Sequence, residues 1–388
     1  MTEIKNLKKA ADRITAAIEK KERIILYGDA DLDGVSSVII LKETIKSLGG
    51  KVSAVYFPDR EIEGYGITKI GLQDLKEHAP ALLLTVDCGI GNFKEIKLAK
   101  KLGFEVMLVE HHEVLDKLPQ AEIIVNPKQK GDKYPFKGLA TVGIVFKLSE
   151  LILGDKIKGV LKNTFLELTA LATLADMMPQ QSENKLFISE GLSLLKKTFR
   201  PGIRVFFTPH FEEKWGVENS LDFIQKVYKM ISILNVRDVE DGFPASYRLL
   251  TASTPAEAEK IVKILLKKGK ARKRKIEKII EEVEKKVKGI PGAIIFEGDA
   301  AFDLILVSSA ASTICQKYQR PTFLYKKMDK ESQGTVRTPK DTDAVELMKK
   351  CKKYPLTFGG HPRAAGFRIK NCNLEKFKKC LIKNLCER

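Results

Sequence analysis

RIILYGDADLDG, residues 23–34, joins an apolar run to three carboxylates spaced at every second position. The apolar half predicts a β-strand. Four similar runs follow, KVSAVYF (51–57), ALLLTVD (81–87), FEVMLVE (104–110) and AEIIV (121–125). Segments with apolar residues three and four apart separate the runs, at 35–48, 67–76 and 93–102. Strands that alternate with amphipathic helices predict an α/β fold built on a parallel sheet.

The rest of the chain changes pattern twice. From Gly138 the apolar spacing is helical, and from about Gly292 short apolar runs predict a smaller mixed sheet with helices. These runs are GAIIFEG (292–298), FDLILVSS (302–309), PTFLYKK (321–327) and AAGFRIK (364–370). We therefore expect a parallel-sheet domain over 1–182, a connector helix over 183–200, a helical region over 201–289 and a smaller α/β domain over 290–388.

Composition narrows the class of protein. Lysine and arginine exceed aspartate and glutamate by 18, a surplus that suits a polyanionic partner, although growth at high temperature also enriches charged residues. No apolar stretch reaches the roughly 20 residues of a membrane span, and the charged N-terminus lacks a secretory pattern, so we expect a cytoplasmic protein. The six cysteines contain no C-x-x-C pair, and we expect reduced thiols.

Asp29, Asp31 and Asp33 follow the first predicted strand directly. Functional groups gather at the carboxyl ends of parallel strands, where the chain leaves the sheet. Three acids so close together repel one another unless a cation lies among them. The alternative is that Asp33 caps a helix beginning near Val35, but a cap needs only one carboxylate. The motif therefore predicts a metal site.

Further acids and histidines stand at the ends of later elements. Asp87 closes the run ALLLTVD, and Glu110-His111-His112 closes FEVMLVE. Asp176 ends an apolar helical segment, where a buried carboxylate without a partner would cost several kcal/mol. Carboxylate and neutral imidazole both bind divalent metals. Together these residue types would suit two divalent ions that assist the hydrolysis of a phosphoester.

Four segments, in this order, resemble the motifs of the DHH phosphoesterases. They are DADLDG (29–34), TVDCGI (85–90), EHH (110–112) and ATLADMMP (172–179). FPDR (57–60) with GYG (64–66), and later GGHPRAAG (359–366), are similar to the RecJ branch and its DHH-associated second domain. The resemblance covers nearly the whole chain and implies a phosphodiesterase that depends on two Mn²⁺ or Mg²⁺ ions.

The resemblance also implies roles for individual residues. The metal ligands would be Asp29, Asp31, Asp33, Asp87, His111 and Asp176. Asp87, which would bridge the ions, and His111 would be catalytic together with His112, which would face the scissile phosphate. Substrate contacts would come from a glycine-rich loop and from two basic residues, for which a solvated charge is the alternative. These residues are Gly359, Gly360 and His361 in the loop, and Arg337 and Arg363.

Glu110 departs from the family pattern, which has aspartate at this position. If Glu110 only orients His111 from behind the metal ligands, activity should survive with an altered rate. If its longer side chain contacts a metal, the cluster would be distorted. We expect the first case, because every other implied ligand is present.

The resemblance favours an exonuclease that hydrolyses single-stranded DNA or RNA in replication or repair. Two alternatives stay open: a phosphodiesterase for short oligonucleotides or dinucleotides, and a replisome scaffold whose nuclease site is weak or silent. The basic run 260–275 would either track a nucleic-acid backbone or form a solvated helix face. Bacterial RecJ proteins usually continue past this motif into an OB-fold, whereas 22 residues follow Gly366 here, so we expect a core-only architecture without the OB-fold. This core-only architecture resembles archaeal relatives and implies replisome partners such as the GINS complex.

Overall fold

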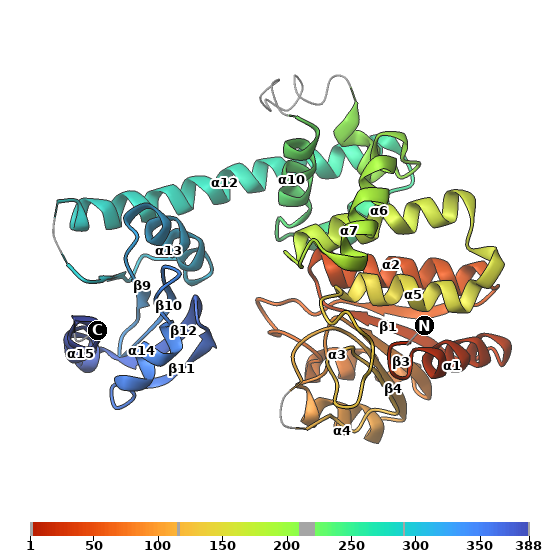
Figure 1. Cartoon of the computed structure of the whole chain (residues 1–388), viewed down its shortest axis with the longest axis horizontal. Helices are drawn as coiled ribbons and strands as arrows, with labels where there is room; N and C mark the ends of the chain where they lie inside the picture. The colour runs from red at the N-terminus through yellow and green to blue at the C-terminus, as the bar shows by residue number, and fades with distance from the viewer. Residues whose placement is uncertain (1–2, 115–116, 209–221, 290–291, 387–388) are drawn as a thin grey trace. The chain divides into compact units, whose positions relative to one another are not determined.

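The computed structural model describes residues 3–114, 117–208, 222–289 and 292–386 (Figure 1). The chain divides into two compact units, unit 1 (Met1–Leu266) and unit 2 (Lys267–Arg388), and each contains a five-stranded sheet. The division falls within helix α12 (Pro255–Val287). The finer boundaries expected at 182, 200 and 289 stay predictions.

The sheet of unit 1 is wholly parallel, in the order β2-β1-β3-β4-β5. Its strands are β1 (Ile24–Gly28), β2 (Val52–Tyr56), β3 (Ala81–Val86), β4 (Phe104–Val109) and β5 (Ile123–Val125). All residues of β1 and β3 are buried, as is typical of a parallel sheet covered on both faces. The strand order changes direction between β1 and β3, and ligands bind at such switch points. The α/β fold and its parallel sheet, predicted from the sequence, are confirmed.

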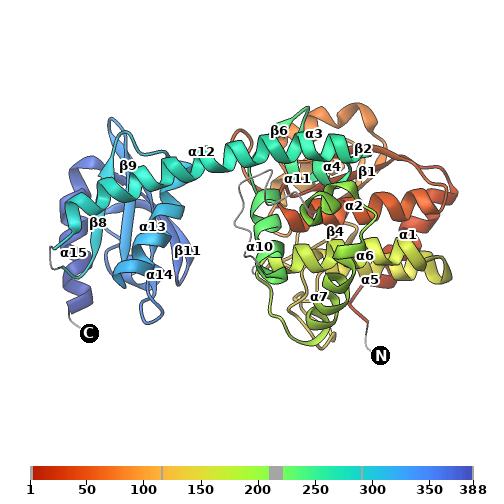
Figure 2. The same cartoon turned by 90° about the horizontal axis from the view of Figure 1, so that it is seen from above.

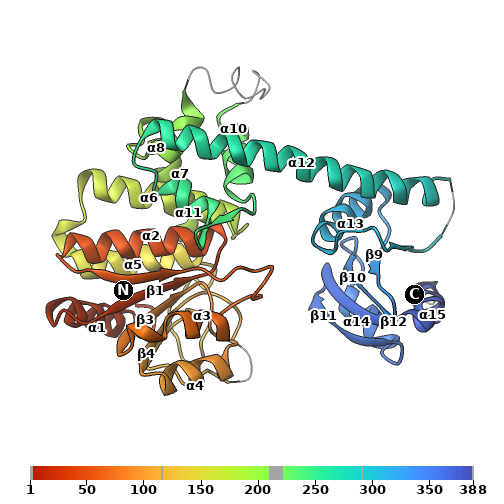
Figure 3. The same ribbon diagram turned by 180° about the vertical axis from the view of Figure 1, so that it is seen from behind.

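Alternate residues of the strands face two separate layers of helices. Ile24 and Leu26 pack in one cluster with residues of many helices, and Ile25 and Tyr27 pack in a second cluster with residues of two others. The first layer comprises α1 (Leu7–Glu19), α2 (Leu32–Ser47) and α5 (Thr141–Leu153), and the second comprises α3 (Lys69–Asp74) and α4 (Phe93–Lys101). Figure 3 shows α2 and α5 on one side of β1 and α3 and α4 on the other.

Further helices extend the first layer. They are α6 (Gly159–Ala175), α7 (Ser182–Leu194), α8 (Pro201–Arg204), α10 (Phe223–Leu234) and α11 (Ala245–Leu250), with a short hairpin of β6 (Val239–Glu240) and β7 (Phe243–Pro244). Single 3₁₀ turns lie at Lys76–His78, Gly154–Lys156, Leu195–Lys197, Val205–Phe207 and Asn371–Asn373. Arg200 joins this helical part to α2, since its Nη2 donates to both carboxylate oxygens of Glu43 at 2.7 and 2.9 Å.

Unit 2 has a mixed sheet in the order β11-β12-β10-β9-β8, in which only β8 and β9 pair in parallel. Its strands are β8 (Ile295–Asp299), β9 (Thr322–Lys327), β10 (Glu331–Arg337), β11 (Pro355–His361) and β12 (Ala364–Lys370). Its helices, besides α12, are α13 (Leu304–Tyr318), α14 (Ala344–Lys350) and α15 (Leu374–Cys386). This is the smaller mixed sheet with helices that the sequence predicts.

Two local predictions in unit 2 are wrong. FDLILVSS lies mostly in helix α13, because Asp303 caps the helix by accepting from Ile305 N and the apolar face continues through Ala310, Ala311 and Ile314. The segment expected to be a glycine-rich loop is strand β11, in which Gly359 pairs with Gly366 and Gly360 with Ala365 across β12. Short stretches of apolar residues fit either state, and pairing across the sheet decides between them.

The cysteine prediction also needs correction, because Cys351 and Cys380 form a disulfide with their Cα atoms 6.0 Å apart. The bond joins the end of α14 to α15, across 29 residues of sequence. Spacing along the chain cannot reveal such a pair, since two helices bring it together. Cys88, Cys315 and Cys372 are free, as expected.

Helix α12 changes character along its length, although it is one unbroken helix (Figure 2). Its first turns bury Ala258, Ile261, Val262 and Leu265 in the core of unit 1, and its last turns bury residues in the core of unit 2. Between them, residues 267–275 bury no side chain. None of the helices in the described ranges combines the length and the apolar character needed to cross a bilayer.

Candidate metal centre

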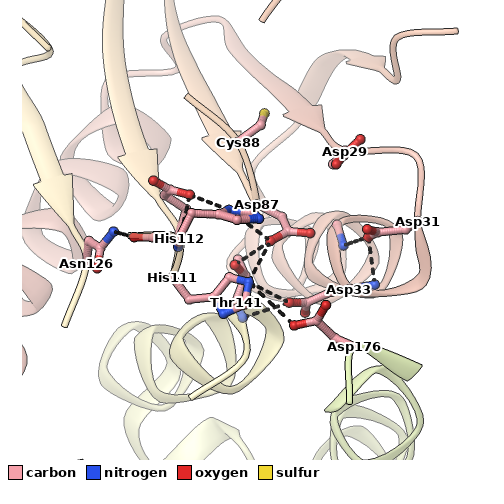
Figure 4. A network of polar contacts seen from close by, with 12 residues as sticks. Asp29, Asp31, Asp33, Asp87, Cys88, His111, His112, Asn126, Thr141 and Asp176 are labelled. Carbon is pink, nitrogen blue, oxygen red and sulfur yellow. Dashed lines mark hydrogen bonds and ion pairs between the residues drawn. The ribbon is translucent and has the colours of Figure 1, made fainter. Parts of the chain in front are cut away.

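The six ligands implied by the motifs converge at the carboxyl edge of the unit 1 sheet (Figure 4). We call them the carboxylate–histidine cluster: Asp29, Asp31, Asp33, Asp87, His111 and Asp176. They follow β1, β3 and β4, or lie at the start of α2 and the end of α6. Segments far apart in sequence meet here because parallel strands end at a common edge, at the switch point between β1 and β3.

The start of α2 fixes the first two carboxylates. The helix begins at Leu32 and Asp31 is its N-cap, accepting from the backbone N–H groups of Asp33 and Gly34 at 3.1 Å. The alternative in which Asp33 caps the helix is therefore wrong. Gly34 is needed here, because a Cβ atom at this position would overlap the backbone of Asp29. The tight turn holds Asp29 and Asp31 at the strand end.

Asp33 and Asp87 are held by the first turn of α5. The carboxylate of Asp33 accepts from the backbone N–H groups of Thr141 and Val142 at 2.8 and 2.7 Å. The Thr141 hydroxyl donates to Asp87 Oδ1 at 2.8 Å. A helix N-terminus favours negative charge, so α5 supports both acids. Sequence reasoning did not assign Thr141 a role, although its place in GLATVG at a predicted helix start was a usable signal.

His111 lies between three carboxylates. Its Nε2 atom is 3.5 Å from Asp87 Oδ1, 3.5 Å from Asp176 Oδ2 and 4.0 Å from Asp33 Oδ2. Burial, followed by the nearby charge of His112, lowers the pKa of His111 to about 3. The imidazole is therefore neutral, the form in which histidine binds metals.

The three carboxylates near His111 carry more negative charge than their surroundings can stabilise. Burial first, and then neighbouring carboxylates, raise the pKa of Asp33 and of Asp87 well above the ordinary value. The same two causes raise the pKa of Asp176 to about 6. Asp176 Oδ2 is also buried without a hydrogen-bond partner. Oxygen and imidazole donors, crowded charge and an unsatisfied buried oxygen together fit divalent cations.

Three sets of donors are compact enough to hold an ion, each with ligand atoms within 4.8 Å of one another. They are Asp29, Asp31 and Asp87; Asp87, His111 and His112; and Asp33, His111 and Asp176. Asp87 and His111 each belong to two sets. This sharing is the arrangement expected if Asp87 bridges two ions, and the bridging role stays a prediction.

Glu110 contacts His112 rather than His111. Its Oε2 lies 2.8 Å from His112 Nδ1 and accepts from the backbone N–H of His112 at 3.3 Å. Glu110 is fully buried, whereas 54% of the His112 side chain is exposed. The hydrogen bond to Glu110 is the largest cause of a raised pKa at His112. The longer side chain therefore acts behind His112, and the expectation that it orients His111 is wrong.

We expect Glu110→Gln to lower the pKa of His112, because the neutral amide no longer stabilises the imidazolium. The measurement is a pH titration of the His112 ring signals by NMR, with the signals assigned through His112→Asn. Glu113→Gln is the matched control, since Glu113 is exposed and pairs with Lys128 instead. An unchanged His112 titration in Glu110→Gln would contradict the assigned role.

Arg60 is a residue of the site that the sequence did not single out for a role. Its Nε donates to Asp29 Oδ1 at 2.8 Å, and its Nη2 lies 2.5 Å from Asp29 Oδ2 and 2.9 Å from Asp31 Oδ2. The guanidinium also stacks 4.9 Å from the ring centroid of Tyr65. The similarity of FPDR and GYG to the RecJ branch was the available signal.

The expected substrate residues lie in unit 2. Arg337 is partly buried and donates to Ser312 Oγ at 3.0 Å, to Thr335 Oγ1 at 2.8 Å and to Ser308 Oγ. It lines a cavity of 820 Å³ together with Arg363 and Lys340. Gly359 and Gly360 lie on strand β11. The side chain of His361 lies outside the described part of the structure.

The fold and the cluster define a class, and comparison with known proteins identifies it. Residues 23–173 match the DHH family, N-terminal domain, and residues 292–387 match the DHHA1 domain. The chain belongs to the DHH superfamily and is RecJ-like within it.

Relatives of the chain carry the RecJ name. Over 95% of its length the chain is 34% identical to the single-stranded-DNA-specific exonuclease RecJ of Bacillus subtilis, of which it spans 46%. It is 28% identical to the protein of the same name from Thermus thermophilus and spans 54% of it. The chain thus spans about half the length of these relatives. A crystal structure of exonuclease RecJ bound to manganese superposes with a TM-score of 0.79 and 26% identity, covering all of this chain and 96% of that one.

Proposed function

We propose that this chain is a divalent-metal-dependent phosphodiesterase, an exonuclease that hydrolyses single-stranded DNA or RNA in replication or repair. The observation that carries the proposal is the convergence of five carboxylates and a neutral histidine at the switch point of the parallel sheet. The relatives named as single-stranded-DNA-specific exonucleases support the choice of substrate.

The metal centre of the proposal holds two Mn²⁺ or Mg²⁺ ions. The ligands would be Asp29, Asp31, Asp33, Asp87, His111 and Asp176, with Asp87 shared between the ions. Such ions activate water and stabilise charge on phosphoryl oxygens. RecJ of Thermus thermophilus has been crystallised in complex with Mn²⁺, which supports this choice of metal.

The protein's own side chains would hold a proton near the phosphate and would orient the metal ligands. His112 is exposed beside the cluster and its raised pKa favours the protonated ring, so it can hold a proton near a bound phosphate. Glu110 fixes the orientation of the ring from behind. The hydroxyl of Thr141 orients Asp87 through a hydrogen bond to Oδ1, and the backbone N–H groups at the N-terminus of α5 hold Asp33. Catalysis would thus involve Asp87, His111 and His112.

Unit 2 would bind the strand through Arg337, Arg363, Gly359, Gly360 and His361. Among the described residues, the hydrogen-bond partners of Arg337 are all neutral, and burial lowers its pKa. A partly buried guanidinium without a carboxylate favours an anionic ligand such as a backbone phosphate. The cavity beside it also presents Lys340 and Arg363.

Helix α12 supplies a second basic surface, residues 267–275, with seven lysines and arginines and no acid. Replacing Lys267, Lys270, Lys273 and Lys275 by Gln should weaken binding to single-stranded DNA. It should also reduce the slope of log K against log salt concentration by up to about 3, at about 0.7 per lost phosphate contact. The measurement is fluorescence anisotropy over a series of salt concentrations.

The matched control replaces the exposed lysines Lys8, Lys9, Lys20 and Lys46 by Gln. It makes the same change in net charge, and its salt slope should stay close to that of the wild type. Equal slopes in all three proteins would instead identify the α12 surface as a solvated helix face.

End-labelled single-stranded DNA and RNA of graded length, incubated with Mn²⁺ and with Mg²⁺, test the proposed activity. An oligonucleotide of about thirty residues should be degraded faster than a dinucleotide, because only the longer strand gains from the basic surfaces. Preference for the dinucleotide would favour the short-oligonucleotide alternative. Metal binding without cleavage of any substrate would favour the scaffold alternative.

We also propose a cytoplasmic location, where the nucleic-acid substrate is found, and replication proteins such as GINS as partners. CDC45 of Entamoeba histolytica shares the fold of this chain, with a TM-score of 0.52 at 11% identity. A pull-down with the tagged, purified GINS complex tests the partnership, and a failure to retain this chain would leave only the nuclease proposal.

A further inference from the structure

The negative charges at the two ends of the carboxylate–histidine cluster have different ion-pair partners. Arg60 forms ion pairs with Asp29 and Asp31 at 2.5 and 2.9 Å. At the other end, no lysine or arginine within the described ranges forms an ion pair with Asp33, Asp87 or Asp176. An arginine thus pairs with one end of the cluster, whereas the ion pairs at the other end, among the described residues, are with His111 and His112.

Arg60 fills most of the acceptor capacity of Asp29. Oδ1 accepts from Ala30 N and from Arg60 Nε, both at 2.8 Å, and Oδ2 contacts Arg60 Nη2. A carboxylate offers about four lone-pair positions, so only one remains for a further partner. A metal ion at the set Asp29, Asp31 and Asp87 must share Asp29 with the guanidinium or displace it.

The loop that carries Arg60 is built to hold it there. Glu63 accepts from the backbone N–H of Asp59 at 2.8 Å and from the hydroxyl of Thr68 at 2.5 Å, closing the loop on itself. Asn92 bonds both backbone groups of Ile67, at 3.1 and 3.2 Å. Gly66, with a φ of 81°, lies against the Asn92 side chain where a Cβ atom would overlap it. The placement of Arg60 is thus defined by both ends of its loop.

We propose that Arg60 is a built-in counter-cation that competes with a divalent ion for Asp29 and Asp31, so that one metal position is filled much more weakly than the other. The inference rests on the proposed two-metal function and concerns the loading of that site. The strong position is the set Asp33, His111 and Asp176, which no arginine occupies. The weak position is the set Asp29, Asp31 and Asp87. Loading of the weak position then sets how activity depends on metal concentration.

Metal binding by the full-length, metal-free protein tests the proposal without reference to activity. Free Mn²⁺ is counted by electron paramagnetic resonance during a titration, and isothermal titration calorimetry gives both affinities. The wild type should bind one ion tightly and a second at least about tenfold more weakly. Arg60→Gln should tighten the second ion at least about tenfold and leave the first unchanged.

Two further variants make the result specific. Arg60→Lys keeps the charge but loses the planar fork that holds two carboxylates, so it should tighten the second ion less than Arg60→Gln does. Arg23→Gln removes an exposed arginine whose hydrogen bonds within the described part of the chain go to the carbonyl groups of His78 and Ala79, and it should change neither affinity. Circular dichroism establishes that each variant is folded, and Arg60→Lys decides the matter if Arg60→Gln is not.

The possible failures are distinct. Two ions of equal affinity in the wild type, or a second ion unchanged or weakened in Arg60→Gln, would overturn the competition by Arg60 and leave the nuclease proposal intact. No binding of Mn²⁺ or Mg²⁺ by the folded wild type would overturn the proposed metal centre itself.

Discussion

Asp87→Asn is expected to reduce nuclease activity at least about a thousandfold, since the proposed bridging carboxylate would support both ions and their loss would remove several kcal/mol of transition-state stabilisation. Asn suits the position because Asp87 has a φ of 61°, in the left-handed region that asparagine tolerates. Its amide oxygen can also keep the hydrogen bond from Thr141. The measurement is the single-turnover rate on end-labelled single-stranded DNA with Mn²⁺.

Asp12→Asn, an exposed acid on α1, is the control and should keep full activity. A second readout separates loss of metal from loss of fold. In EDTA, Asp87→Asn should unfold at a higher temperature than the wild type, because one of the repelling buried charges is gone. Activity within a few-fold of the wild type would contradict a central role for Asp87.

Metal-free protein is expected to lose stability as the pH rises, and a divalent ion should restore it. An acid whose pKa is higher in the folded than in the unfolded state binds its proton more tightly when folded. Its stabilising effect is therefore complete at low pH and is lost as the pH rises. For Asp176 the loss falls between the ordinary value near 3.8 and about 6. The raised pKa values of Asp33 and Asp87 act in the same direction.

The comparison with Asp176→Asn isolates this effect from other titrations. The substitution sacrifices no hydrogen bond of Oδ2, since this atom accepts none and lies 3.5 Å from His111 Nε2. In EDTA at pH 7 the variant should be more stable than the wild type by about 1–2 kcal/mol after allowance for partial exposure, and the difference should vanish near pH 4. Urea unfolding of the full chain, followed by far-ultraviolet circular dichroism at pH 7 and at pH 4, measures both differences in stability.

Mn²⁺ at a hundred times its dissociation constant should stabilise the wild type by about 2.7 kcal/mol per ion at pH 7. The gain should be much smaller in Asp176→Asn, which lacks one ligand of the proposed strong position. A wild type whose metal-free stability rises steadily from pH 4 to pH 7, with no response to Mn²⁺, would contradict the electrostatic account of the cluster.

The sequence predicted unit 1 well because its strands are continuous apolar runs. β1 and β3 are buried at every residue, and carboxylates or histidines follow β1, β3 and β4 at once. The rule that function gathers at the carboxyl ends of parallel strands then brings Asp29, Asp87 and His111 together. Apolar periodicity and sheet topology are thus enough to predict the site where each strand is a continuous apolar run and the sheet is parallel.

Contacts that depend on side-chain direction or on the meeting of distant segments could not be predicted in this way. The partner of Glu110 depends on side-chain direction, and the role of Thr141 depends on how the start of α5 lies against Asp87. The ion pairs of Arg60 depend on the course of a loop. In unit 2, strands β10 and β11 carry too few apolar residues to stand out, and pairing with β12 supplies what their own sequence lacks.

The two hydrogen bonds that α5 gives to Asp33 have a consequence for how this protein can vary. Both donors are main-chain amides, so they do not depend on which side chain stands at Val142. Most exchanges there leave the anchor of Asp33 in place, and proline, which has no amide hydrogen, is the substitution that would remove it. The position of Asp33 therefore depends on the backbone of α5. Most single substitutions in this helix should leave that position unchanged.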